Sequence, residues 1–110
     1  MKHGIEDTDK HYKEILLFPD YASSGIWCSC GLSITNPIED LFIPRSIIEL
    51  VDLWNSYWES CDNDGIENEY ATNQIISTGR VLRDMISMYM PCEFLEERCK
   101  FTERYKKDDI

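Results

Sequence analysis

The sequence has few histidines and none of the short motifs that identify common enzyme classes. Its two histidines, His3 and His11, lie in a polar N-terminal segment. A catalytic cysteine normally needs a histidine base nearby, so a Cys–His enzyme is not expected. There is no glycine-rich phosphate loop, no H-E-x-x-H and no G-x-S-x-G in the chain. We therefore predict a protein that is not an enzyme.

Long apolar runs are also missing. The longest ones are interrupted by charged residues such as Glu49, Asp52, Arg83 and Asp84, so no segment is expected to span a membrane. The N-terminal stretch MKHGIEDTDKHYKE is polar and acidic, which argues against a secretory signal. Five cysteines cannot all form disulfides with one another, and free thiols indicate a reducing cytoplasm.

Acidic residues, by contrast, are abundant. The 110 residues include 21 acidic and 11 basic ones, which gives a formal net charge of −10. The excess is concentrated in residues 44–71, which alone contribute −6. Such a field repels nucleic acid and anionic membranes and attracts a basic partner. A solvated surface that only keeps the protein soluble would have the same composition.

The spacing of apolar residues predicts one α+β domain, with residues 1–12 as a flexible arm and residues 13–105 as the ordered core. The short apolar runs EILLF and GIWCSC, separated by the turn residues PDYASSG, predict an N-terminal hairpin. Alternating residues in CKFTERYK, at positions 99–106, predict a C-terminal strand that completes a small antiparallel sheet. The sheet is expected to pack against two main helices.

Both helices are predicted to be amphipathic. They follow NPIEDLFIP, an irregular connection because it contains two prolines. A second helix over residues 72–90 ends before Pro91 and has a wide apolar arc, which fits either a central helix or a dimer interface. Gly79 on this arc would let another element approach closely. The first helix, over residues 44–60, has one apolar face made of Ile47, Leu50, Val51, Trp54, Tyr57 and Trp58.

Cys28 and Cys30 are the sharpest local signal of chemistry. Residues two apart in a strand face the same side, so both thiols could approach one metal ion. A structural zinc site needs four ligands, and no second cysteine pair follows at a suitable distance. We therefore expect no metal and no cofactor, and interpret the cysteines as small apolar core residues. A thiol- or zinc-dependent protein centred on this pair is the alternative.

The acidic segment DNDGIENE, from Asp62 to Glu69, superficially resembles a calcium loop. An EF-hand needs a third ligand before the glycine and a Glu at its twelfth position, where this chain has Asn73. A solvated acidic loop fits the sequence better. The aromatic residues of the preceding helix lack basic neighbours, so they do not form a platform for stacking nucleic acid bases.

Three segments resemble a widespread set of small bacterial proteins: DYASSGIW, ITNPIEDLFIPRSIIELVDLWNSYWE and STGRVLRDM. Proteins of this kind are similar to the cognate immunity proteins of polymorphic toxin and contact-dependent growth inhibition systems, which are small, acidic and cytosolic. The resemblance implies binding and inhibition of a toxin domain, often a nuclease, and does not identify the toxin. The residues that carry it are mostly structural: Gly25, Ile26, Trp27, Pro37, Leu41, Pro44, Ser46, Leu50, Trp54, Trp58, Gly79 and Leu82.

The function is therefore predicted to lie on an acidic surface, because contiguous carboxylates can steer and hold a basic protein surface. We predict an immunity protein that occludes the active site or substrate groove of a basic toxin domain, with neither nucleic acid nor membrane as its partner. An acidic adaptor subunit unrelated to toxins is the other alternative, and the oligomeric state stays open. The predicted contact residues are Glu49, Asp52, Glu59, Asp62, Asp64, Glu67 and Glu69.

Overall fold

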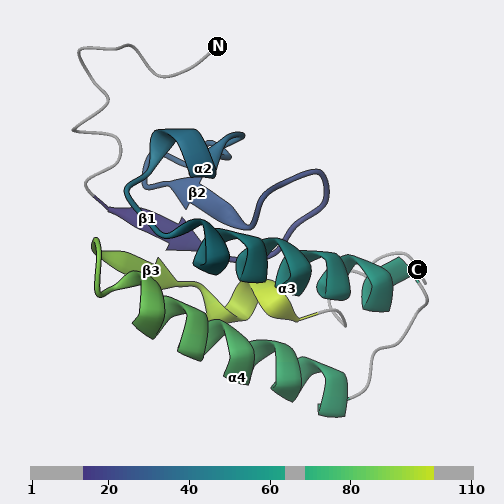
Figure 1. Ribbon diagram of the computed structural model, residues 1–110. Helices are drawn as coiled ribbons and strands as arrows, with labels where there is room; N and C mark the ends of the chain where they lie inside the picture. Colours follow the sequence, from purple (N-terminus) through teal and green to yellow (C-terminus); the bar gives the residue numbers. More distant parts are fainter. Residues whose placement is uncertain (1–13, 64–68, 101–110) are drawn as a thin grey trace.

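The computed structural model describes residues 14–63 and 69–100, and these ranges form an α+β fold, as predicted (Figure 1). The predicted N-terminal arm, residues 1–12, lies outside the described residues. The elements follow in the order β1 (Ile15–Leu17), β2 (Ile26–Cys28), α2 (Pro37–Asp40), α3 (Arg45–Asn63), α4 (Glu69–Ile86), β3 (Cys92–Phe94) and the short 3₁₀ helix η2 (Glu96–Cys99).

The sheet has the strand order β2-β1-β3, so β1 is its central strand. β1 and β2 form the predicted antiparallel hairpin, with Leu16 opposite Trp27. β3 pairs with β1 in parallel, with Leu16 opposite Glu93, so the sheet is mixed rather than antiparallel throughout. The predicted strand at residues 99–106 is not observed at Cys99, which lies in η2, and residues 101–106 are outside the described residues.

The direction of β3 follows from the turn that ends α4. Backbone bonds from Tyr89 and Met90 to the carbonyl of Ile86 close the last turn, and the chain reverses before Pro91. β3 then runs back along α4 and takes the same direction as β1. The N–H of Ile15 bonds to the carbonyl of Pro91 at 3.1 Å, which fixes the start of both strands.

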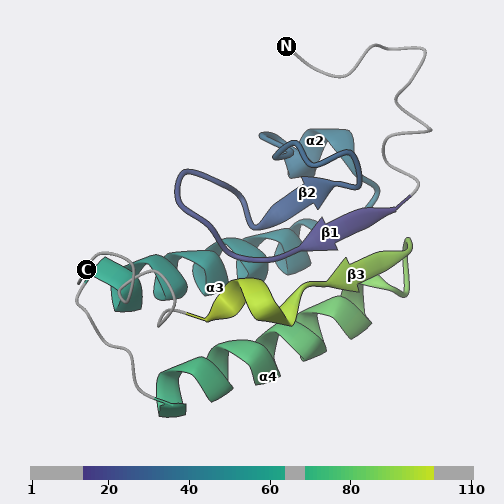
Figure 2. The ribbon, with the colours of Figure 1, turned by 180° about the vertical axis from the view of Figure 1, so that it is seen from behind.

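The two long helices lie on one side of the sheet, and Figure 2 shows the strands and η2 in front of them. α3 begins at Arg45 and continues to Asn63, three residues beyond the predicted end. Trp54 and Trp58 are buried as predicted, whereas Leu50 and Tyr57 are exposed at the edge of the apolar stripe. The reason is that α3 packs against the sheet and α4 over only part of its circumference.

α4 runs from Glu69 to Ile86 rather than over residues 72–90, and its buried stripe is narrower than predicted. Val81 and Met88 are exposed, so the wide apolar arc of the sequence is only partly used in the core. The buried positions recur every three or four residues: Ala71, Ile75, Gly79, Leu82 and Ile86. Neither long helix is apolar enough to cross a membrane, as far as the described residues extend.

The prediction that Gly79 allows a close approach is confirmed. A Cβ atom at this position would lie 2.2 Å from Cζ of Phe94, which comes from β3. The Phe94 ring in turn packs edge-on against Trp54, with ring centroids 5.9 Å apart. The glycine therefore leaves room for the Phe94 ring of β3 to pack directly against α4.

The connection NPIEDLFIP is more ordered than predicted, because Pro37 opens the single helical turn α2. Its fixed φ suits the first helical position, where a backbone N–H has no partner. Leu41 and Ile43 on the following segment are buried, and they carry the chain into α3.

Candidate protein-binding surface

The loop between β1 and β2 is fastened to α3 by one buried amide. The Asn55 side chain is 2% exposed. Its Oδ1 accepts a hydrogen bond from the N–H of Asp20 at 2.9 Å, and its Nδ2 donates to the carbonyls of Asp20 and Ser23 at 3.1 and 3.3 Å. Gly25, at φ +84°, brings the loop back so close that an added Cβ would lie 3.0 Å from Val51. The loop is therefore held beside α3 and forms one side of the groove described next.

A groove runs between the β1–β2 loop and α3, and we call it the acidic groove. It consists of two adjoining hollows of about 470 and 330 Å³, which share Ser24, Thr35 and Asp52. Three of the predicted contact residues line it. The first hollow is lined by Ala22, Ser23, Ser24, Ser33, Thr35, Asp52, Asn55, Ser56 and Glu59. The second is lined by Ser24, Thr35, Asn36, Pro37, Ile38, Ile48, Glu49 and Asp52.

The three carboxylates of the acidic groove differ in their surroundings. Glu59 accepts hydrogen bonds from the N–H of Ala22 at 3.2 Å and from Asn55 at 3.4 Å. Glu49 pairs with Arg45 at 3.1 Å, and both side chains are largely exposed. Asp52 is exposed and lines both hollows, so it lies at the centre of the groove.

Asp62 does not join this group. It is 6% exposed, and the hydroxyl of Tyr21 donates a hydrogen bond to it. The Tyr21 ring also packs edge-on against buried Trp58, with centroids 5.3 Å apart. At 100° per residue, position 62 faces the loop rather than solvent. This carboxylate therefore holds the loop, and we do not assign it to the binding surface.

The other predicted contact residues lie away from the groove. Glu69 is exposed at the first position of α4 and lines neither hollow. Asp64 and Glu67 are outside the described residues.

The outward side of α3 carries apolar residues next to the acidic groove. Leu50 and Leu53, which we call the α3 ridge, are three positions apart and therefore lie on one side of the helix. Leu53 is 66% exposed, although it is a large aliphatic residue. Glu49 and Ser56 follow on the groove side of this ridge, by the same helical geometry.

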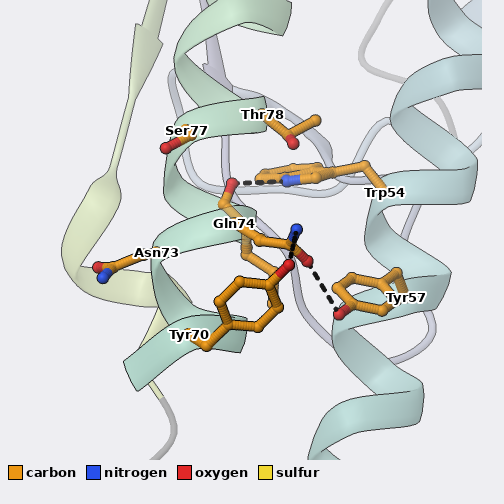
Figure 3. Close-up of a pocket in the computed structure, with 8 residues that line it drawn as sticks. Trp54, Tyr57, Tyr70, Asn73, Gln74, Ser77 and Thr78 are labelled. Atoms are coloured by element: carbon orange, nitrogen blue, oxygen red, sulfur yellow. Dashed lines mark hydrogen bonds between the residues drawn. The ribbon is translucent and has the colours of Figure 1, made fainter. Parts of the chain in front are cut away.

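Beyond the ridge lies another hollow, between α3 and α4, which we call the aromatic cleft (Figure 3). Its volume is about 380 Å³. Tyr57 from α3 and Tyr70 from α4 lie on two sides of Gln74, and the Trp54 ring points from α3 toward α4. The lining residues are Trp54, Tyr57, Tyr70, Asn73, Gln74, Ile75, Ser77 and Thr78.

Hydrogen bonds hold the aromatic cleft together. Gln74 Nε2 donates to the hydroxyl of Tyr70 at 2.9 Å, and the hydroxyl of Tyr57 donates to Gln74 Oε1 at 3.5 Å. The thiol of Cys61, one turn further along α3, raises the pKa of Tyr57 through a hydrogen bond. Tyr57 is therefore a neutral phenol at physiological pH. The sequence pattern missed this cleft, because Tyr57 has core spacing and nothing in the sequence singles out Tyr70 or Gln74.

Within the described residues, Cys28 and Cys30 differ in their surroundings. Cys28 ends β2 and is buried, while Cys30 is exposed in the turn that Gly31 closes by donating to the carbonyl of Cys28. Burial raises the pKa of Cys28, which disfavours a reactive thiolate. Across residues 14–63 and 69–100, no group of three or more His, Cys, Asp or Glu side chains is arranged to hold a metal ion.

The exposed side of α3 thus combines three kinds of surface: an acidic groove, an apolar ridge and an uncharged aromatic cleft. Protein interfaces commonly join an apolar or aromatic centre to a polar rim in this way. No protein-family model and no curated protein matches this chain.

Proposed function

We propose that this chain is an immunity protein, which binds a cognate bacterial toxin domain and neutralises it by covering its active site or substrate groove. The observation that carries the proposal is the side of α3 where Glu49, Asp52 and Glu59 line one groove beside exposed apolar residues. The resemblance of the sequence to immunity proteins of polymorphic toxin systems supports the same function.

The charge of the groove suggests a nuclease as the toxin. An enzyme that acts on nucleic acid needs a basic surface, because its substrate is a polyanion. Carboxylates that line a groove can meet the same basic side chains and exclude the substrate from them. The proposed protein is a binding protein rather than an enzyme, and it acts in the cytoplasm, where free thiols persist.

The two kinds of surface have different physical roles in such a complex. Exposed carboxylates accelerate encounter with a basic protein and discriminate between partners, and salt screens this effect. Desolvated aromatic and aliphatic contacts supply most of the binding free energy. Each basic residue of the described ranges offsets one negative charge, and all five lie within 4.0 Å of a carboxylate: Arg45, Arg80, Arg83, Arg98 and Lys100. Of these five, only Arg45 pairs with a carboxylate of the acidic groove, Glu49.

The test uses the toxin domain encoded in the neighbouring reading frame, purified as a catalytically inactive variant. Its association with the full chain is followed by stopped-flow fluorescence at two salt concentrations. We expect the association rate constant to fall about tenfold between 50 and 300 mM salt, because opposite charges steer the encounter. Asp52→Lys should slow association by about tenfold at low salt.

The matched control is Glu93→Lys, which makes the same charge change at an exposed position of β3, away from α3. It should slow association less than twofold. A rate that salt does not change, or equal effects of the two charge reversals, would remove the acidic groove from the proposal. In cells that produce the active toxin, an Asp52→Lys chain that protects as well as the original would contradict the binding surface itself.

A further inference from the structure

The polar atoms of the three aromatic residues in the cleft already have partners within the protein. The indole N–H of Trp54 donates to the carbonyl of Ile75 at 2.9 Å. The hydroxyls of Tyr57 and Tyr70 are both bonded to the Gln74 side chain. What the three aromatic residues offer to the cleft is therefore mainly the surface of their rings (Figure 3).

Two of these three rings are exposed to solvent. Tyr70 is 70% exposed and Tyr57 is 44% exposed, while Trp54 forms a buried floor. Apart from Ile75, the other side chains that line the cleft, such as Asn73 and Ser77, are polar but uncharged. A charged side chain that entered would lose hydration without meeting an opposite charge, whereas an apolar or aromatic one would gain contact with the rings.

We infer that the aromatic cleft receives an aromatic or aliphatic side chain of the same basic protein whose charges the acidic groove meets. This inference rests on the proposed function in taking the exposed side of α3 as the binding surface. The α3 ridge, Leu50 and Leu53, joins the cleft to the groove, so one partner surface covers all three.

Charge selects a basic protein over a second copy of this chain. If two copies met through this side of α3, Glu49, Asp52 and Glu59 of one copy would approach the same carboxylates of the other. Like charges in an interface cost free energy and suppress the wrong pairing. The occupant of the cleft is therefore a side chain from a protein of opposite charge.

The groove and the cleft then affect different rate constants of binding. Carboxylates at the rim mainly set the association rate, while a side chain seated in the cleft mainly slows dissociation. Loss of a ring from the cleft should leave the salt dependence of binding unchanged. Loss of a carboxylate should leave the preference for an aromatic side chain unchanged.

Two synthetic peptides of equal charge test the chemistry of the cleft without the toxin. The first is acetyl-Lys-Lys-Gly-Trp-Gly-Lys-Lys-amide, and the second has Ala in place of Trp. Each is titrated into the full ¹⁵N-labelled chain, and the three indole N–H signals report where it binds. Trp54 lies in the cleft, whereas the indoles of Trp27 and Trp58 are bonded to the carbonyls of Phe18 and Cys99 elsewhere.

We expect the Trp peptide to shift the Trp54 signal, to leave the other two in place, and to bind about tenfold more tightly than the Ala peptide. In Tyr70→Ala the two peptides should bind equally, because a ring of the cleft is missing. Tyr70→Phe keeps the ring and should keep the preference. Asp52→Asn should weaken both peptides by the same factor.

The matched control is Tyr89→Ala, which removes an exposed tyrosine beyond the end of α4 and should change nothing. Equal binding of the two peptides to the original chain would overturn the inference. So would a preference that persists in both Tyr57→Ala and Tyr70→Ala. A dimer in sedimentation that Leu53→Lys dissociates would show that a second copy covers the cleft, and would also overturn it.

These outcomes are separate from the test of the proposed function. Peptides that behave as expected, together with no binding of the toxin domain, would contradict the immunity function and leave the chemistry of the cleft intact. Toxin binding that depends on Asp52 but not on Tyr57 or Tyr70 would contradict the inferred role of the cleft and leave the immunity function intact.

Discussion

Gly79→Ala is expected to destabilise the protein, although alanine is the better helix former. An added Cβ would lie 2.2 Å from Cζ of Phe94 and 2.7 Å from its two Cε atoms. Ordinary contacts of a Cβ atom begin near 3.4 Å, so the ring would have to move by more than 1 Å. Phe94 is buried and packs against Trp54, which leaves the ring little room to move.

The size of the effect follows from two opposing contributions. Overpacking of a well-packed core costs about 1–3 kcal/mol. Replacing glycine by alanine inside a helix returns about 1 kcal/mol. The required displacement is large, which places the cost in the upper part of its range, so we expect a net loss of about 1–2 kcal/mol in the free energy of unfolding.

Urea denaturation followed by tryptophan fluorescence measures this loss. With a slope of about 1.5 kcal/mol per M, the midpoint should fall by about 1 M. Thr78→Ala, at the neighbouring exposed position, gains helix propensity without meeting Phe94 and should leave the midpoint unchanged or higher. In a Phe94→Leu background the cost of Gly79→Ala should shrink. A Gly79→Ala protein at least as stable as the original would refute the close packing of α4 on β3.

Three further predictions concern the loop, an ion pair and the thiols. Asn55→Ala should lower the free energy of unfolding by about 2–3 kcal/mol, because it leaves buried loop backbone groups without partners; an unchanged urea midpoint would contradict this. Arg80 lowers the pKa of Glu96. The Arg80–Glu96 ion pair therefore stabilises the fold above the usual pKa of about 4.5, and this stabilisation is lost as the pH falls through the lowered value. Thermal unfolding of Glu96→Gln should match that of the original chain only at the acidic end of the pH range. Iodoacetamide at pH 8 should label exposed Cys30 well before Cys99, whose pKa burial raises to about 12, and equal rates by mass spectrometry would be inconsistent with this structure.

The fold could be predicted where the sequence has a long periodic signal. The spacing of Trp54 and Trp58 placed α3, and Gly79 on an apolar arc indicated the close approach that Phe94 makes. β3 could not be predicted, because Cys92–Phe94 has a central Glu93 and lacks the apolar run that marks β1 and β2 in the sequence. Its parallel direction depends on the turn after α4, a tertiary property.

The candidate site could be predicted only in part, for a related reason. Carboxylates on one side of a helix are visible in the sequence, and Glu49, Asp52 and Glu59 do line one groove. The opposite wall is a loop held by Asn55 across 35 residues of sequence, and no local pattern encodes such a contact. The aromatic cleft needs two helices side by side, so it exists only once Tyr70 of α4 is packed near α3.

β1 is the central strand of the sheet, and its two neighbours are made at very different times during translation. β2 follows within a few residues, but β3 comes after both long helices. Until β3 emerges from the ribosome, one edge of β1 lacks its partner and Gly79 faces no ring. Such non-local pairing slows folding and exposes an unpaired strand edge in the nascent chain. The edge of β1 would thus stay exposed to chaperones until the residues of β3 have been made, and the proposed binding side of α3 would be fully supported only after Phe94 has packed against Trp54.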